Sequence, residues 1–232
     1  MQPTNGYESR RHHSGTERET DRIEAFSDGV FAFAITLLVL NIRIPSGHSA
    51  NGSVNLSSSL LHLWPSYFAY LLSFVMIGIY WANHHYVFKL YAKTNHAFNL
   101  LNLLFLLFIA LLPLPTLTLS EYLLDPKNRT AAATMYASAL LLQATTWSIA
   151  WLYAAHGGRL IDSHLDRTFV HRLTRQYLGS VALYAIAVAI CIVNVTAGLA
   201  ICVGLTLLYL LPPRSPLYVK QDSDRCPPSL TS

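Results

Sequence analysis

Two clusters of polar side chains stand at the ends of long apolar stretches in this sequence. Arg22, Ser27 and Asp28 precede the first stretch, and His84 follows the second. A carboxylate beside an imidazole can relay a proton, whereas a carboxylate beside a guanidinium forms a structural ion pair. Ionisable groups inside a membrane are costly unless they are paired. The residue types alone therefore leave three alternatives open: a proton relay, a paired structural network, or charges at the membrane interface.

The histidines do not form a recognisable metal site. Adjacent His84 and His85 point about 100° apart on a helix, whereas chelating pairs are three or four residues apart, as in HExxH. The sequence also lacks the GxxxxGK[ST], GxSxG and GxGxxG motifs. We therefore expect no metal, no cofactor and no enzymatic activity. The net charge of +4 is explained by Lys and Arg beside anionic lipid, so we expect no nucleic-acid partner.

The composition is typical of an integral membrane protein. Of the 232 residues, 53% are hydrophobic and 12% are charged, against about 25% charged residues in soluble domains. Asp, Glu, Lys and Arg are absent from four long stretches, which are residues 44–88, 94–120, 130–158 and 176–213. A helix needs about 20 apolar residues to cross a bilayer. Stretches of this length therefore predict transmembrane helices.

Proline, glycine and asparagine divide the chain into six predicted transmembrane helices. Pro45 ends the first helix, Pro113 and Pro115 end or kink the third, and NVTAG at 194–198 separates the last two. The helices are expected at residues 23–44, 60–80, 96–120, 131–153, 177–193 and 199–211. The second is expected to continue as a helix through residue 91. The predicted fold class is all-α.

The basic residues predict the orientation of the chain. With both termini in the cytoplasm, only Arg43, Lys127 and Arg129 of the 16 Lys and Arg residues lie outside, as the positive-inside rule requires. We therefore expect a multi-pass protein of the cell membrane. Its expected parts are a polar cytoplasmic segment at 1–21, a six-helix transmembrane domain at 22–212 and a disordered cytoplasmic tail at 213–232.

An apolar stripe runs along the first predicted helix. Phe33, Leu37 and Leu40 stand at i, i+4 and i+7 and so share one face. Thr36 lies one turn from Phe33 towards the side, where its hydroxyl can meet an ion or water. Such a stripe usually faces lipid or a neighbouring helix. Alternatively, four stripes around a symmetry axis form stacked apolar constrictions that conduct only when they are wet.

Three segments of the sequence resemble the prokaryotic relatives of the lysosomal potassium channel. They are RIEAFSDGVFAFAITLLVL in the first helix, WANHHYVF in the second and NLLNLLFLLF in the third. The resemblance covers most of residues 20–120. It implies a potassium-permeable channel without the usual TVGYG filter. It also implies one six-helix repeat per chain, four chains per pore, and a pore lined by the first helix of each subunit.

The resemblance also implies roles for individual residues. The narrowest apolar ring falls on Phe33, where the family usually has isoleucine, and further rings fall on Leu37 and Leu40. Thr36 matches a polar ring of the pore. The family's structural polar network and its packing neighbours fall on residues of the first two helices: Arg22, Ser27, Asp28 and His84, with Phe26 and Trp81.

We therefore expect a passive homotetrameric channel in the lipid bilayer that selects potassium over sodium. Potassium ions pass transiently, and no cofactor takes part. One alternative is a proton-coupled transporter or proton-permeable channel in which Asp28 and His84 relay protons. A third possibility is a helical membrane scaffold without transport activity.

Overall fold

The structure is a computed structural model, and it describes residues 6–43, 48–49, 52–53, 56–162 and 164–210. Pro45, expected to end the first helix, and the expected cytoplasmic tail at 213–232 lie outside the described residues. Within them, the chain is helical apart from turns, loops and a small hairpin of β1 (His48–Ser49) and β2 (Gly52–Ser53). The expectation of an all-helical fold is confirmed.

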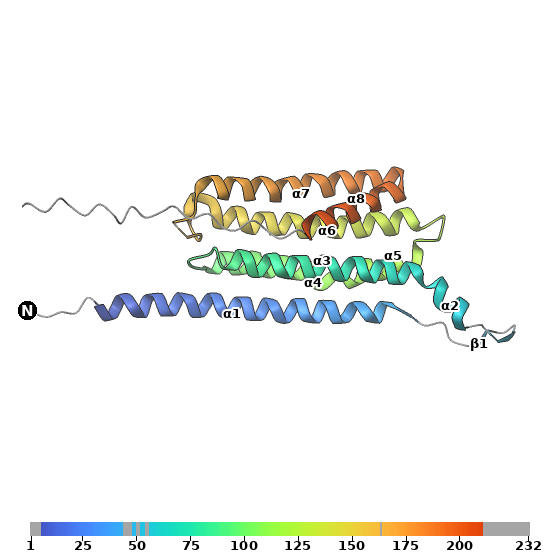
Figure 1. Cartoon of the computed structure of the whole chain (residues 1–232), viewed down its shortest axis with the longest axis horizontal. Coiled ribbons are helices and arrows are strands. Elements are labelled where there is room, and N and C mark those ends of the chain that lie inside the picture. The colour runs from blue at the N-terminus through green and yellow to red at the C-terminus, as the bar shows by residue number, and fades with distance from the viewer. Residues whose placement is uncertain (1–5, 44–47, 50–51, 54–55, 163, 211–232) are drawn as a thin grey trace, which may run out of the picture.

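The helices follow one another as largely antiparallel rods (Figure 1). Their bounds are α1 Gly6–Leu38, η1 Val39–Asn41, α2 Leu56–His62, α3 Trp64–Phe88, α4 His96–Leu111, α5 Pro113–Tyr122, α6 Arg129–Ala155, η2 His156–Gly158, α7 Arg167–Val193 and α8 Val195–Tyr209. Here η denotes a short 3-10 turn.

Four of the described segments are long and apolar enough to cross a bilayer. They are Thr20–Asn41, Trp64–Phe88, His96–Tyr122 and Arg167–Val193. α6 has 27 residues but is not among these segments, and α8 has only 15. The membrane character of the chain is thus supported by its helices, and the exact number of six crossings stays a prediction.

Several helices begin at residues that differ from the sequence prediction, first among them α1 and α3. α1 begins at Gly6 and not near residue 23. The stretch from there to Arg22 contains no proline, so the helical backbone continues beyond the apolar part. α3 begins at Trp64 and not at residue 60, because Pro65 occupies its first turn. In the first turn of a helix the backbone N–H has no helical partner, so the missing N–H of proline costs no hydrogen bond there. The residues before it form the separate helix α2.

The remaining helix ends have local causes. Pro113 divides the third predicted helix into α4 and α5, as the sequence predicts. Asn194 ends α7 and also caps α8, because its side-chain oxygen accepts a hydrogen bond from the N–H of Ala197 at 3.1 Å. α7 begins at Arg167, ahead of the predicted residue 177, because Asp166 caps its N-terminus in the same way.

α1 lies along one edge of the bundle. Figure 1 shows α3, α4 and α5 between α1 and the group of α6, α7 and α8. α1 packs on α3, α4 and α5, whereas α7 packs on α6 and α8. Only 22% of the α1 span is buried, against 28% to 39% of the other three spans. Within the described part of the chain, α1 therefore leaves a long face uncovered.

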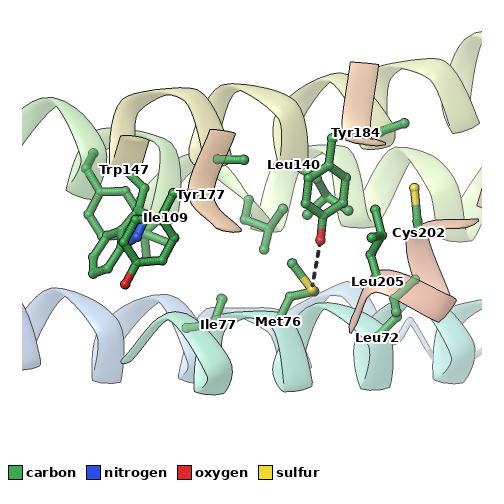
Figure 2. Packing of buried hydrophobic residues seen from close by; sticks show 14 of the residues in the cluster. Leu72, Met76, Ile77, Ile109, Leu140, Trp147, Tyr177, Tyr184, Cys202 and Leu205 are labelled. Atoms are coloured by element: carbon green, nitrogen blue, oxygen red, sulfur yellow. Dashed lines mark hydrogen bonds between the residues drawn. The ribbon is translucent and has the colours of Figure 1, made fainter. Parts of the chain in front are cut away.

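The core between α3, α6, α7 and α8 contains polar groups whose hydrogen bonds are satisfied internally. Figure 2 shows Met76 pointing toward Tyr184. The Met76 sulfur accepts hydrogen bonds from the hydroxyls of Tyr184 at 3.8 Å and Thr206 at 2.8 Å. The Ser73 hydroxyl bonds with that of Tyr136 at 3.0 Å. These bonds hold hydroxyls inside an apolar environment at little cost.

α7 and α8 approach each other closely at Gly198. A Cβ atom added there would lie 2.8 Å from the Cα and backbone N of Cys191. Backbone atoms cannot rotate away as a flexible side chain can. The turn at Asn194 therefore requires a glycine at this position.

We expect Gly198→Ala to lower stability by about 1–3 kcal/mol, because overpacking forces α7 and α8 apart. The measurement is the midpoint of thermal unfolding of the purified chain in detergent. Gly179→Ala is the matched control, since no atom lies within 4 Å of its added Cβ and alanine favours a helix over glycine. Equal midpoints for the two variants would contradict the close approach.

Candidate functional site

Two loops at one end of the bundle are joined by backbone hydrogen bonds. The N–H of Ala92 donates to the carbonyl of Leu160 at 2.8 Å, and the N–H of Asp162 donates to the carbonyl of Leu90 at 3.0 Å. These bonds connect the α3–α4 loop to the α6–α7 loop. We call this end, where the α1 span begins, the inner end, and the opposite end the outer end. Basic residues gather at the inner end: Arg22, Lys89, Lys93, Arg159, Arg167, Arg172 and Arg175.

A buried hydrogen-bonded chain joins α1, α3 and α4 through Asn102. The Asn102 amide donates to Oγ of Ser27 at 3.0 Å, and its Oδ1 lies 3.1 Å from Nε2 of His84, which donates to it. Ser27 donates in turn to the carbonyl of Ile23 at 2.8 Å. Ser27 and His84 are 0% exposed and Asn102 is 5% exposed. Because buried polar groups are costly without partners, this series of hydrogen bonds fixes α1 against α3 and α4.

Aromatic rings enclose the imidazole of His84. Phe88 stacks on it with ring centroids 4.2 Å apart, and Phe31 of α1 meets it edge-on at 5.4 Å. Phe105 and Trp147 lie 6.4 Å and 6.2 Å away. Its Nδ1 has no hydrogen-bond partner among the described residues. The side chain of His84 is thus enclosed by residues of its own polypeptide, and its hydrogen-bond partner is Asn102.

Asp28 bonds with Trp81 and not with the predicted partners Arg22 and His84. Its Oδ1 accepts a hydrogen bond from the Trp81 indole N–H at 2.9 Å. No ion pair within 4.0 Å joins Asp28 to another residue of the described ranges. The imidazole of His84 is directed away, toward Asn102 on α4. Within one polypeptide, the predicted network is therefore divided into two parts. Asp28 and Trp81 form an exposed pair, and Ser27 and His84 are joined through Asn102 in the buried hydrogen-bonded series.

Sequence reasoning missed a second contact at the inner end. Glu24 of α1 contacts Nδ1 of His85, one residue along α3 from the buried histidine. The spacing of Glu24 and Asp28, one helical turn, gave a signal for two parallel contacts with α3. In the described ranges, no three His, Cys, Asp or Glu side chains gather as metal ligands.

Two other predicted residues contact little of their own chain. Arg22 is exposed, and no ion pair of its side chain occurs within the described residues. Phe26 is 57% exposed, so the packing predicted for it is made only in part. Both residues lie on the side of α1 that faces away from the bundle.

The apolar stripe of α1 also lies on this free side. Phe33 is 63% exposed and Leu40 is 69% exposed, while Leu37 is half-buried. Thr36 is exposed between them, and its hydroxyl donates to the carbonyl of Phe33 at 2.8 Å. Because this bond uses the hydroxyl proton, the lone pairs of the oxygen remain available to a cation or to water.

The opposite face of α1 is held by the bundle. Phe31 is 1% exposed, and Ala34 and Leu38 are 0% exposed. At the outer end, Asn41 donates from Nδ2 to the carbonyl of Pro113 at 2.8 Å. The span Thr20–Asn41 is therefore fixed at both ends and along one face, which orients the stripe outward.

We expect Asn102→Ala to lower stability by roughly 2–6 kcal/mol, because both Ser27 and His84 lose a buried partner at about 1–3 kcal/mol each. Thermal unfolding in detergent measures this loss. Asn99→Ala is the matched control on the same helix, since the Asn99 oxygen has no partner in the described part of the chain. A loss in the control as large as in Asn102→Ala would contradict the structural role of the buried chain.

Several known proteins are similar to this chain. The family described as "Endosomal/lysosomal potassium channel TMEM175" matches residues 22–113. A potassium channel of Chamaesiphon minutus is 45% identical over 195 residues, which cover 84% of this chain and 95% of the relative. A potassium channel of Streptomyces collinus is 40% identical over 192 residues, which cover 82% of this chain and 91% of the relative.

A solved structure shares the fold. The crystal structure of a lysosomal potassium-selective channel TMEM175 homolog from Chamaesiphon minutus matches with a TM-score of 0.76 and 43% identity, over 84% of this chain and 97% of that chain. The human endosomal/lysosomal proton channel TMEM175 is 33% identical over 144 residues, which cover 58% of this chain and 29% of the human protein. These relatives are named as ion channels, in agreement with the expectation that the chain is not an enzyme.

Proposed function

This chain belongs to the TMEM175 family, and from that membership we propose that it is a passive potassium channel formed by four identical chains. The potassium-channel names of the bacterial relatives and the potassium-selective solved structure support the permeant ion. The channel needs no cofactor, and its six-helix domain comprises residues 22–212. Potassium ions move through it down their own gradient.

One observation carries the proposal: α1 presents an apolar stripe on its free face while its other face is fixed. In four chains around an axis, the free faces line a common path. Phe33, Leu37 and Leu40 then form three apolar rings within about 10 Å along the helix, at 1.5 Å per residue. Apolar constrictions of this kind conduct when wetted and close when dry.

Thr36 supplies a polar ring between the apolar ones. Its free lone pairs can replace water around a dehydrating cation, as carbonyl oxygens do in other channels. Phe33 sets the narrowest ring, and its flat side chain narrows the path further than a branched aliphatic one. The inner-end residues Ser27, Asp28 and His84 hold the pore helix in place through their contacts and do not transfer protons.

The basic residues support an orientation with both termini in the cytoplasm of the cell. Arg43, Lys127 and Arg129 are at the outer end, and the other Lys and Arg side chains of the described helices and loops are toward the inner end. The positive-inside rule places the inner end in the cytoplasm. The cell membrane is the compartment that fits this distribution.

The proton-relay alternative is less well supported by the geometry. A relay through Asp28 and His84 needs these groups in contact directly or through one hydrogen-bonding group. Asp28 bonds with Trp81, whereas His84 bonds with Asn102 and is enclosed by aromatic rings. A channel with a fixed structural histidine fits these contacts better.

The function is tested by potassium flux in liposomes that contain the purified chain, with sodium flux as the comparison. Wild type should pass potassium faster than sodium, and Phe33→Asn or Leu37→Asn should pass more of both ions and discriminate less, because the rings stay wet. Ile186→Asn is the control, since Ile186 is 50% exposed on α7, away from α1. Unchanged flux in the α1 variants would place the stripe against lipid.

Assembly is tested by chemical cross-linking of the chain in mild detergent. A bifunctional reagent should trap species of two, three and four chains, and none larger at low protein concentration. Addition of a cysteine at Thr36, near the proposed axis, should give disulfide-linked dimers, whereas one at Ile186 should not. The native Cys191 and Cys202 are buried, and the third native cysteine, Cys226, is replaced by serine in both variants. A ladder that ends at two chains would contradict the tetramer.

A further inference from the structure

A groove of about 640 Å³ opens on the side of the bundle at its outer end. Residues of α3, α6 and α8 and of the turn after α5 line it, and none belongs to α1. Its walls are mostly apolar and include Trp64, Phe68, Leu199 and Leu207. Its volume lies within the range of about 300–1,000 Å³ that is typical of small-molecule sites. The groove is separate from the surface proposed to line the pore.

Two polar residues stand among these apolar walls. Arg129 is the first residue of α6, and Thr196 is the second residue of α8. Both are exposed. Their helix N-termini face the outer end, where the helix dipoles favour an anion. This polar end of the groove therefore combines a cation, a hydroxyl and two positive dipole ends.

The cation of Arg129 is not neutralised within the described part of the chain. No ion pair within 4.0 Å joins it to a carboxylate. The carboxylate of Asp125, in the preceding loop, accepts hydrogen bonds from the N–H of Lys127 and the amide of Asn128. These bonds hold the pKa of Asp125 below its usual value. The carboxylate of Asp125 therefore interacts with groups of its own loop and not with the guanidinium of Arg129.

The length of the groove matches one leaflet of a bilayer. From Thr196 to Leu207 the α8 helix rises about 17 Å at 1.5 Å per residue, and half of the hydrocarbon core is about 15 Å. Trp64, at the same end as Arg129, is 49% exposed, as tryptophans at the membrane–water interface often are. The polar residues therefore lie at headgroup level, and the apolar wall lies beside the acyl chains.

We propose that this groove binds one glycerophospholipid of the leaflet at the outer end. The phosphate bonds with Arg129 and Thr196, and one acyl chain lies along α8 beside Leu199 and Leu207. An anionic headgroup binds more tightly than a choline headgroup, because the choline cation repels Arg129. The lipid fills a space that the chain's own side chains leave open.

The charge part of the proposal is tested by native mass spectrometry of the full chain in detergent with added phosphatidylglycerol or phosphatidylcholine. Wild type should bind one phosphatidylglycerol per chain more tightly than phosphatidylcholine. Arg129→Gln should weaken phosphatidylglycerol binding about tenfold, since a charge-assisted hydrogen bond is lost. Lys127→Gln is the matched control, because Lys127 is a neighbouring cation that does not line the groove. Equal losses in both variants would overturn the proposal.

The acyl-chain part is tested by filling the groove. Gly204 lines it, and no atom lies within 4 Å of an added Cβ, so Gly204→Phe blocks the space without a clash at that atom. This variant should lose the one bound lipid, whereas Gly179→Phe on α7 should retain it. Lipids bound at the basic inner end are the same in all variants, so they do not contribute to the difference in bound lipid between the variants. Lipid binding by Gly204→Phe equal to wild type would overturn the proposal.

Discussion

The hydrogen bond from Asn102 to Ser27 determines which side of α1 faces away from the bundle. In an apolar environment neither side chain finds water as a substitute partner, so the bond is broken only at the full cost of two buried polar groups. Phe33 lies six residues beyond Ser27, which is about 120° around a helix with 3.6 residues per turn. A rotation of α1 by a single residue position would separate Ser27 from Asn102 and turn Phe33 toward the bundle. The orientation of the stripe therefore depends on a polar contact made one and a half turns away.

Apolar packing alone does not supply this precision. In a bilayer the lipid chains are as apolar as leucine, so Leu38 gains little by preferring α3 to lipid. Hydrogen bonds are directional, so they distinguish one rotation of α1 from another where apolar burial does not. The α1 span has such bonds at both ends: the buried one from Asn102 at the inner end, and the one from Asn41 to Pro113 at the outer end. Between these two bonds, small and apolar side chains such as Ala34 only have to pack against the neighbouring helices without a clash.

The sequence predicts the features of this fold that local chemistry determines. Pro113 interrupts a helix wherever it occurs, Asn194 caps one, and the spacing of Phe33 and Leu40 defines a face without knowledge of any partner. Partner choice is different, because it depends on helix rotations that a single sequence does not contain. The resemblance implies a network of Asp28 with Arg22 and His84, whereas within one chain the donor that reaches Asp28 is the indole N–H of Trp81. Asn102 stands within the NLLN segment, but nothing local distinguishes it from Asn99, which has no such partner. The membrane span of α1, Thr20–Asn41, agrees with the predicted residues 23–44, but the helix extends back to Gly6 because the length of a membrane span sets only a minimum for a helix.

α1 is longer than the membrane requires, and this has a mechanical consequence. Its 33 residues rise about 50 Å at 1.5 Å per residue, whereas the hydrocarbon core is about 30 Å thick. No proline divides the part that projects beyond the inner end from the part that bears Phe33 and Leu37. A continuous helix of this kind is stiff, so a sideways force or a torque on its projecting part is not absorbed in a hinge. It is transmitted along the rod as strain on the anchoring contacts of the span.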